Sequence, residues 1–274
     1  MRGAPILIEE VEVDYPAERR SLRTILRGIT LDIQGGEFVS IVGQTGCGKS
    51  TLLRLILGEE RPTRGRVLVD GVVRTQPDRH CGYVPQRYSL FPHKTVLDNV
   101  TFGPEVTELG PVPLPFRHYR RRREEIREEA LRYLRHTGLQ GSDARKYPHQ
   151  LSGGMQQRVA IARALTLDPE VLLMDEPFGA LDAITREEMR QCLLDIWERT
   201  GKTVVLVTHS IDEAVFLSRE VHVLGGRPAR IIETISIGLP EPRTEACLTD
   251  PAFARAEARL RSLLIESHRT GKRA

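Results

Sequence analysis

Residues 37–57 read EFVSIVGQTGCGKSTLLRLIL, and this stretch decides the fold. Its first part, residues 37–42, is an apolar run typical of a strand buried on both faces of a sheet. Its second part, residues 43–50, fits the pattern G-x-x-x-x-G-K-[ST], and the residues after it favour a helix. A buried strand, a glycine-rich loop and a helix in this order indicate a phosphate-binding loop in an α/β protein.

The residue types in this loop explain how it would hold a nucleotide. Its glycines let backbone N–H groups surround anionic oxygens, and the following helix directs its positive end at them. Lys49 is expected to reach the β- and γ-phosphates of the nucleotide, and the Ser50 hydroxyl is expected to ligate Mg²⁺. The nucleotide-binding residues predicted in this segment are Gly43, Gln44, Thr45, Gly46, Cys47, Gly48, Lys49, Ser50 and Thr51.

Cys47 lies inside the loop, between two glycines. Neighbouring backbone amides and Lys49 predict a stabilised thiolate there, with a packing role and some sensitivity to thiol reagents. The other three cysteines, Cys81, Cys192 and Cys247, lack paired or metal-binding spacing. All four thiols are therefore predicted to be reduced, as in a cytoplasm.

Further apolar segments recur at the spacing of an α/β protein. Residues 6–14 and 29–33 alternate as half-buried strands do, whereas Val171–Asp175 and Thr203–Thr208 are nearly continuous apolar runs. Residues 182–200 carry apolar side chains on one face of a helix. The pattern predicts a mainly parallel sheet between helices, flanked by antiparallel strands near the N-terminus.

The composition excludes several classes of protein. The 274 residues include 40 Lys and Arg against 37 Asp and Glu, and 40% of them are hydrophobic, which predicts a well-packed globular chain. A net charge of +3 argues against nucleic acid as a partner. Charged residues interrupt every apolar stretch, so neither a membrane span nor a signal peptide is expected. The length allows two domains of about 150 residues or one domain with an insertion.

The middle of the chain has a different composition. Residues 103–115 contain four prolines, which predicts a loop rather than a helix or a central strand. Residues 117–135 contain eight arginines and four glutamates, with apolar residues at every fourth position from 126 to 134. This spacing predicts an amphipathic helix. Pairs such as Arg120–Glu124 and Glu128–Arg132 favour a solvated face over a nucleic-acid or lipid contact.

Val171–Asp175 and the following Glu176 form an apolar run that ends in two acids. Asp175 would lie at the end of a strand beside the phosphate-binding loop and could hold Mg²⁺ through water. Glu176 could orient or activate a water molecule that attacks the terminal phosphate. Because many strands end in acidic residues, this run taken alone leaves both a structural and a catalytic interpretation open.

Residues 151–157 read LSGGMQQ and directly precede the helix-forming RVAIARAL. In this motif the chain resembles the nucleotide-binding subunits of ATP-binding-cassette (ABC) transporters, whose signature is LSGGxQ, and it has Met155 where the fullest signature has Gln. The resemblance implies that Ser152, Gly153 and Gly154 bind a phosphate of ATP held by a second subunit, in a head-to-tail dimer. It also implies an α/β P-loop NTPase fold of ABC type, with an N-terminal antiparallel β subdomain and an inserted α-helical subdomain.

Other positions match the family one by one. Gln86 resembles the Q-loop glutamine that touches Mg²⁺ and water, Asp182 lies in a stretch like the D-loop at the dimer interface, and His209 resembles the switch histidine near the γ-phosphate. Tyr15 resembles the aromatic residue that stacks on adenine. The resemblance implies the following functional residues: catalytic Glu176, His209, Lys49 and Gln86, and Mg²⁺ ligands Ser50, Gln86 and Asp175.

The resemblance also implies an organisation and a set of partners. An ATPase domain is expected over residues 1–245, with a helical insertion at about 94–165 and a short helical extension over 246–274. ATP hydrolysis would drive a separate integral membrane permease from the cytoplasmic face of the inner membrane. Residues 91–93 with 95–100, and residues 212–215 with 227–231, are most similar to those of nitrate, sulfonate and taurine importers. This similarity implies a periplasmic or lipid-anchored solute-binding protein.

Two other functions are kept as alternatives. One is the ATPase of a lipid-handling or cell-envelope ABC complex, and the other is a nucleotide-gated scaffold without useful turnover. The joint presence of Lys49, Asp175, Glu176 and His209 argues against the scaffold, which would not need all four. DNA-repair relatives with the same signature carry long coiled coils, for which residues 71–150 leave no room.

Overall fold

The computed structural model describes residues 3–17, 21–110 and 116–271. In these ranges the strands form one ten-stranded sheet. Its strands, in spatial order, are β5 (Val72–Val73), β4 (Arg64–Val69), β1 (Ile6–Pro16), β2 (Leu22–Ile33), β10 (Ala229–Ser236), β9 (Glu220–Gly226), β3 (Phe38–Gly43), β8 (Thr203–Thr208), β7 (Val171–Asp175) and β6 (Cys81–Val84).

The strands from β9 to β6 are parallel to one another and form the centre of the molecule. Every residue of β3 is buried, as its apolar sequence predicts. Val39 and Ile41 pack in one apolar cluster with Leu52, whereas Phe38 and Val42 pack in another on the opposite face. The helices that cover the two faces are α1 (Lys49–Leu57), α5 (Ala183–Thr200), α6 (Ile211–Leu217) and α7 (Pro251–Gly271).

The remaining strands form an antiparallel region at the other side of the sheet. β1 pairs with β2 and β4 in antiparallel fashion, and β5 closes this edge. A single residue pair, Ala229 with Leu26, joins β10 to β2. The predicted strand over residues 29–33 is longer in the structure, where it begins at Leu22. The predicted fold class, a mainly parallel core with an N-terminal antiparallel region, is confirmed.

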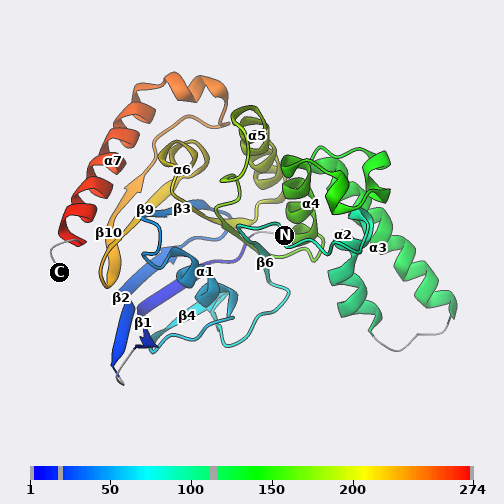
Figure 1. Ribbon diagram of the computed structural model, residues 1–274, viewed down its shortest axis with the longest axis horizontal. Coiled ribbons are helices and arrows are strands. Elements are labelled where there is room, and N and C mark those ends of the chain that lie inside the picture. Colours follow the sequence, from blue (N-terminus) through cyan, green and yellow to red (C-terminus); the bar gives the residue numbers. More distant parts are fainter. Residues whose placement is uncertain (1–2, 18–20, 111–115, 272–274) are drawn as a thin grey trace.

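A group of helices lies at one end of the molecule, and α7 lies at the other end beside β10 (Figure 1). A third apolar cluster holds this group together, with Val100, Leu134 and Val159 fully or almost fully buried. Its main helical segments are α2 (Val96–Pro104), the π-helix η2 (Glu105–Leu109), α3 (Phe116–His136) and α4 (Gly153–Leu165). Short 3₁₀ helices are formed by Gly141–Arg145, Pro148–Gln150 and Glu245–Thr249.

The prediction of a loop over residues 103–115 is wrong for its first part. Pro104 is the last residue of α2, and the chain continues as a π-helix to Leu109. Proline disrupts a regular α-helix because it lacks an N–H group, and here the change to π-helical turns falls at this residue. Thr107 Oγ1 donates a hydrogen bond to the Gly103 carbonyl at 3.0 Å, which satisfies that acceptor. The prolines at 111, 113 and 115 lie outside the described residues.

The predicted amphipathic helix is confirmed as α3, and Ile126, Ala130 and Leu134 are buried. One expected ion pair is wrong, because Arg132 pairs with Glu129 at 3.7 Å instead of with Glu128. Several α3 arginines reach carboxylates on neighbouring elements, which sequence spacing along one helix does not reveal. These pairs are Arg122 with Glu108, Arg123 with Glu105 and Arg127 with Asp98.

None of the helices within the described ranges combines the length and apolar character needed to cross a membrane.

Candidate nucleotide-binding site

The glycine-rich loop lies between β3 and α1, where the sequence predicted it. β3 ends at Gly43, and α1 begins at Lys49 directly after Gly48. Gly48 has a φ of +108°, and a Cβ at this position would lie 2.7 Å from Leu26 Cδ2, so glycine is required. Lys49 Nζ donates to the carbonyls of Gly43 and Gln44 at 2.8 and 3.0 Å. The loop is thereby closed around the lysine ammonium group.

A pocket of about 330 Å³ opens beside this loop. Its walls come from β1, β2, the loop, α1 and the segments that follow β6 and β7. The predicted site residues that line it are Tyr15, Thr45, Gly46, Gly48, Lys49, Ser50, Thr51, Gln86, Asp175 and Glu176. The fold thus brings together residues that lie as far apart in sequence as Tyr15 and Glu176.

Glu176 is the point at which the polar side chains of this site meet. Its carboxylate lies 3.9 Å from Lys49 Nζ, accepts a hydrogen bond from Gln86 Nε2 at 3.0 Å and lies 3.2 Å from His209 Nδ1. The Glu176 side chain is only 14% exposed, whereas that of His209 is 57% exposed. A largely buried carboxylate with three polar neighbours is held in a defined position, as a group that handles a proton requires.

The backbone of Glu176 is strained. Its φ is +46°, a left-handed conformation that costs a non-glycine residue free energy, and its N–H donates to the Val207 carbonyl at 2.8 Å. This hydrogen bond ties the residue after β7 to the neighbouring strand β8. Strain of this kind is concentrated at functional sites, where it fixes a side chain in place.

Asp175, the last residue of β7, is buried beside the loop. Burial raises the pKa of this carboxyl above its usual range, and a hydrogen bond from Ser50 works in the opposite direction. Tyr83 also donates to Asp175, and burial raises the pKa of this phenol to about 12. A divalent cation near Ser50 and Asp175 would compensate the buried negative charge, so this pair suits a hard cation with oxygen ligands.

Tyr15 is connected to α1 by a chain of polar contacts. Its hydroxyl hydrogen-bonds Glu60, whose carboxylate also lies 3.3 Å from Arg54 Nε. Arg54 Nη2 in turn donates to Thr51 Oγ1 at 3.3 Å. The aromatic ring is therefore anchored to the helix that begins at the phosphate-binding loop. Burial raises the pKa of the Tyr15 phenol, and the hydrogen bond with Glu60 raises it further by a smaller amount.

Arg23 and Ile25 also line this pocket, and neither is among the predicted site residues. They lie on β2, and Arg23 pairs directly with Tyr15 in the β1–β2 register. The predicted strand begins only at residue 29 and so omits them. The sequence does contain a signal for these two residues. A short connection joins Tyr15 to the segment that contains them, and two antiparallel strands joined in this way place residues near the connection side by side.

The predicted thiolate at Cys47 is wrong. Burial raises the pKa of this thiol, and the opposing effect of Lys49 is smaller. The Cys47 sulfur faces the Leu224 carbonyl at 3.9 Å, which is consistent with the expected packing role. All four cysteines are free, as predicted.

We expect iodoacetamide at pH 8 to alkylate Cys47 more slowly in the folded protein than in the urea-unfolded chain. The folded thiol is the poorer nucleophile because burial raises its pKa. Peptide mapping at timed intervals measures the rate at each cysteine, and the three other thiols in the same digest serve as internal references. Faster labelling of Cys47 in the folded state would restore the thiolate prediction.

The signature residues do not line the pocket. Ser152 caps the N-terminus of α4 and accepts a hydrogen bond from Met155 N at 3.3 Å. Asp182 caps α5 in the same way, through Thr185 N at 3.0 Å. The two N-termini lie close together, since a Cβ on Gly154 would be 2.3 Å from Thr185 Cγ2. Ser152, Gly153, Gly154 and Asp182 therefore form a second group of residues, apart from the loop of their own chain.

The loop, its sheet context and the acids at the end of β7 define a P-loop nucleotide-binding protein. Over residues 26–179 the chain matches the family described as ABC transporter, and it belongs to that family. It is 44% identical over 253 residues to the nitrate import ATP-binding protein of Synechocystis sp., with 90% of each chain covered. It is also 44% identical over 234 residues to the taurine import ATP-binding protein of Burkholderia thailandensis, with 85% of each chain covered.

A solved structure is similar as well. It is the dimeric, post-hydrolysis state of an ATP-binding cassette bound to ADP and inorganic phosphate, with a TM-score of 0.72 and 33% sequence identity. The alignment covers 85% of this chain and 98% of that one. The chain is thus the ATP-binding subunit of an ABC transporter and an ATPase of a family that forms dimers.

Proposed function

We propose that this chain hydrolyses ATP to drive the import of a small solute of the nitrate, sulfonate or taurine class through a separate permease. The main support for turnover is the arrangement around Glu176, which Lys49, Gln86 and His209 contact from three separate segments. A protein that only binds nucleotide has no need of a strained, buried carboxylate at this position. The import class rests on the similarity to nitrate and taurine import subunits.

In the proposed reaction Glu176 orients the attacking water and accepts its proton, while Gln86 and His209 fix the carboxylate and the water. Lys49 leaves its present carbonyl partners to neutralise the β- and γ-phosphates, and the backbone N–H groups of residues 43–51 surround them. The water attacks the γ-phosphorus, the bond to the β-γ bridging oxygen breaks, and ADP keeps the electron pair. Catalysis is then a matter of position and charge, without a covalent intermediate.

Mg²⁺ fits this site because Ser50 offers a hydroxyl and Asp175 a buried carboxylate beside it. When bound, the ion would neutralise charge between the β- and γ-phosphates. Gln86 would supply a further oxygen. The described residues hold no cluster of three or more His, Cys, Asp or Glu side chains suited to a metal ion, which agrees with a site completed by phosphate oxygens.

Two copies of the chain would bind two ATP molecules head to tail. Ser152, Gly153 and Gly154 would direct the N-terminus of α4 at the γ-phosphate held by the partner, since a helix N-terminus attracts anions. Asp182 would lie across the same interface. The separation of this group from the loop of its own chain supports the assignment.

The permease would contact Gln86 and the group of helices that includes α2, η2, α3 and α4. In this region Phe102, Val106 and Tyr147 are 36%, 58% and 40% exposed, and exposed apolar side chains are typical of contacts with other proteins. The proposed location is the cytoplasmic face of the inner membrane, with a periplasmic or lipid-anchored solute-binding protein on the other side. Closure and opening of the ATPase dimer would move the permease between its two states.

The function is tested by isolating the tagged chain from its native membranes in mild detergent and identifying its partners by mass spectrometry. A polytopic permease together with a solute-binding protein is expected. Val106→Asp is expected to lose the permease, whereas Ile265→Asp, which is similarly exposed on α7, should retain it. Recovery of a lipid-handling or cell-envelope complex instead would leave the ATPase intact and contradict the import assignment.

Tyr15→Ala is expected to weaken MgATP binding about 5- to 150-fold, because stacking of a base on an aromatic ring is worth about 1–3 kcal/mol. Glu60→Gln should weaken it less, since the ring remains but loses its charged anchor. Equilibrium titration of the purified chain measures both. Tripolyphosphate, which has no base, is the control ligand, and an equal loss of its affinity would contradict the stacking role.

A further inference from the structure

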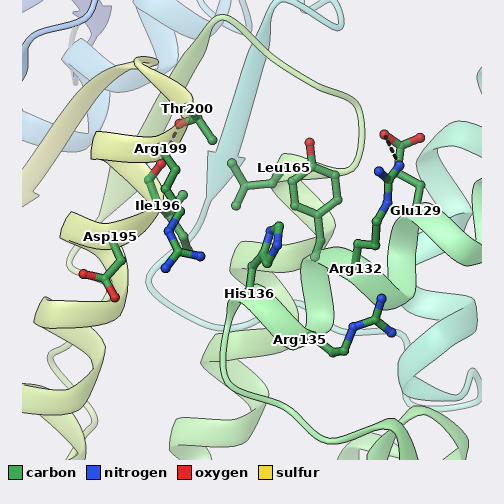
Figure 2. Close-up of a pocket in the computed structure, with 10 residues that line it drawn as sticks. Glu129, Arg132, Arg135, His136, Leu165, Asp195, Ile196, Arg199 and Thr200 are labelled. Carbon is green, nitrogen blue, oxygen red and sulfur yellow. Dashed lines mark hydrogen bonds and ion pairs between the residues drawn. The ribbon is translucent and has the colours of Figure 1, made fainter.

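A second pocket, of about 450 Å³, lies between the last turns of α3 and α5. Figure 2 shows α5 on one side of it and α3 on the other, with Leu165 from the end of α4 between them. None of the residues that line it belongs to the nucleotide-binding motifs. The nucleotide site therefore does not explain this pocket.

The floor of the pocket is apolar. Leu165 is fully buried and Ile196 is 5% exposed, while Tyr133 is half-buried beside them. The Tyr133 ring meets the ring of His136 edge to face, with centroids 6.3 Å apart. Such a surface suits an apolar and preferably flat group, which gains free energy by leaving water.

The rim of the pocket carries more cationic than anionic side chains. Arg132 is paired with Glu129 at 3.7 Å, and Asp195 accepts a hydrogen bond from Gln191 at 3.2 Å. The guanidinium groups of the two other arginines, Arg135 and Arg199, make no hydrogen bond or ion pair with another residue in the described part of the chain. They come from different helices and line the same opening (Figure 2).

Arginines in the last turn of a helix also interact favourably with the helix dipole, and both arginines occupy such positions. The dipole does not account for an apolar floor beside two exposed arginine side chains that line one opening. A guanidinium group binds carboxylate, sulfonate or phosphate oxygens through parallel hydrogen bonds. Both side chains are exposed, so each can turn toward an anionic head that enters this opening.

We propose that this pocket binds a small organic anion that has one carboxylate, sulfonate or phosphate-monoester head on an apolar body. The head lies between Arg135 and Arg199, and the body covers Tyr133, Leu165 and Ile196. Because α3 belongs to the helical group and α5 covers the sheet, the bound ligand joins these two parts and favours one arrangement of them. The site is thus an effector site, separate from the nucleotide.

The experiment is isothermal titration of the full chain with benzoate, benzenesulfonate and phenyl phosphate, with saturating MgADP present so that the phosphate-binding loop is occupied. Sodium sulfate tests the head without the body, and benzyl alcohol tests the body without the head. Arg135→Gln and Arg199→Gln alter the proposed site. Arg121→Gln is the matched control, since it removes an exposed arginine of the same helix outside the pocket.

At least one aromatic anion is expected to bind one per chain, more tightly than sulfate or benzyl alcohol. Each pocket variant should bind this anion about tenfold or more weakly, because a hydrogen bond to a charged group contributes about that much. Arg121→Gln should bind it as the wild type does. Equal binding in all variants, or no binding of the three anions at millimolar concentration, would overturn the proposal. Because the titration measures binding of the anion directly, a negative result would contradict this proposal whether or not the chain hydrolyses ATP.

Discussion

Glu176→Gln is expected to bind MgATP as the wild type does and to lose hydrolysis by a factor of about 10²–10⁴, the usual contribution of a general base. The substitution keeps the size of the side chain and one carbonyl oxygen for the hydrogen bond with Gln86. An amide cannot take the proton of the attacking water, so ATP remains uncleaved between the two subunits. The variant should accumulate as a closed dimer in the presence of MgATP.

Phosphate release measures the loss of turnover, equilibrium titration measures nucleotide affinity, and light scattering measures the dimer. Glu170→Gln is the matched control, because Glu170 immediately precedes β7 at the end opposite Glu176 and pairs with His80 away from the site. It should hydrolyse ATP normally. Turnover at the wild-type rate in Glu176→Gln would remove Glu176 from the proposed mechanism.

Ser152→Asp is expected to reduce hydrolysis at least about a hundredfold, comparable to the loss of one donor that stabilises a developing negative charge. Aspartate is as good a helix N-cap as serine, so α4 should still begin at Gly153. The carboxylate nevertheless places a negative charge where the γ-phosphate of the partner's ATP is expected. Binding of MgATP to the isolated monomer should be unchanged.

Ser152→Thr serves as the control, since it keeps both a hydroxyl group and a capping oxygen. Its activity should stay close to that of the wild type. A monomer of Ser152→Asp that no longer binds MgATP would show that Ser152 serves the site of its own chain, and the cross-subunit assignment would then be wrong.

The parts of the site that the sequence predicted are those defined by short, local patterns. The P-loop requires glycines, Lys49 and Ser50 in one continuous segment, and its neighbouring strand is apolar because helices cover both faces. The same holds for the run that ends in Asp175 and Glu176. In these two segments the apolar residues of the strand already indicate which positions are buried.

The errors and omissions involve partners that are distant in sequence. The contact of Tyr15 with Glu60 joins residues 45 positions apart, and no local pattern indicates it. The thiolate prediction for Cys47 depends on its neighbours in the loop, whereas burial has the largest effect on the pKa of this thiol. The helix beyond Pro104 depends on contacts with α3, whose Arg122 and Arg123 reach carboxylates of η2.

The single residue pair between β10 and β2 has a consequence for how the sheet fluctuates. Leu26 and Ala229 are the only ladder pair at this boundary in the described chain, whereas β1 and β2 share a long register. Backbone amides there should exchange with deuterium sooner than those of β3, because less structure must open. Tyr15 lies on one side of the boundary and the phosphate-binding loop on the other. A nucleotide that contacts both would hold the two sides of the boundary together. MgADP should therefore slow the deuterium exchange of the amides at this boundary.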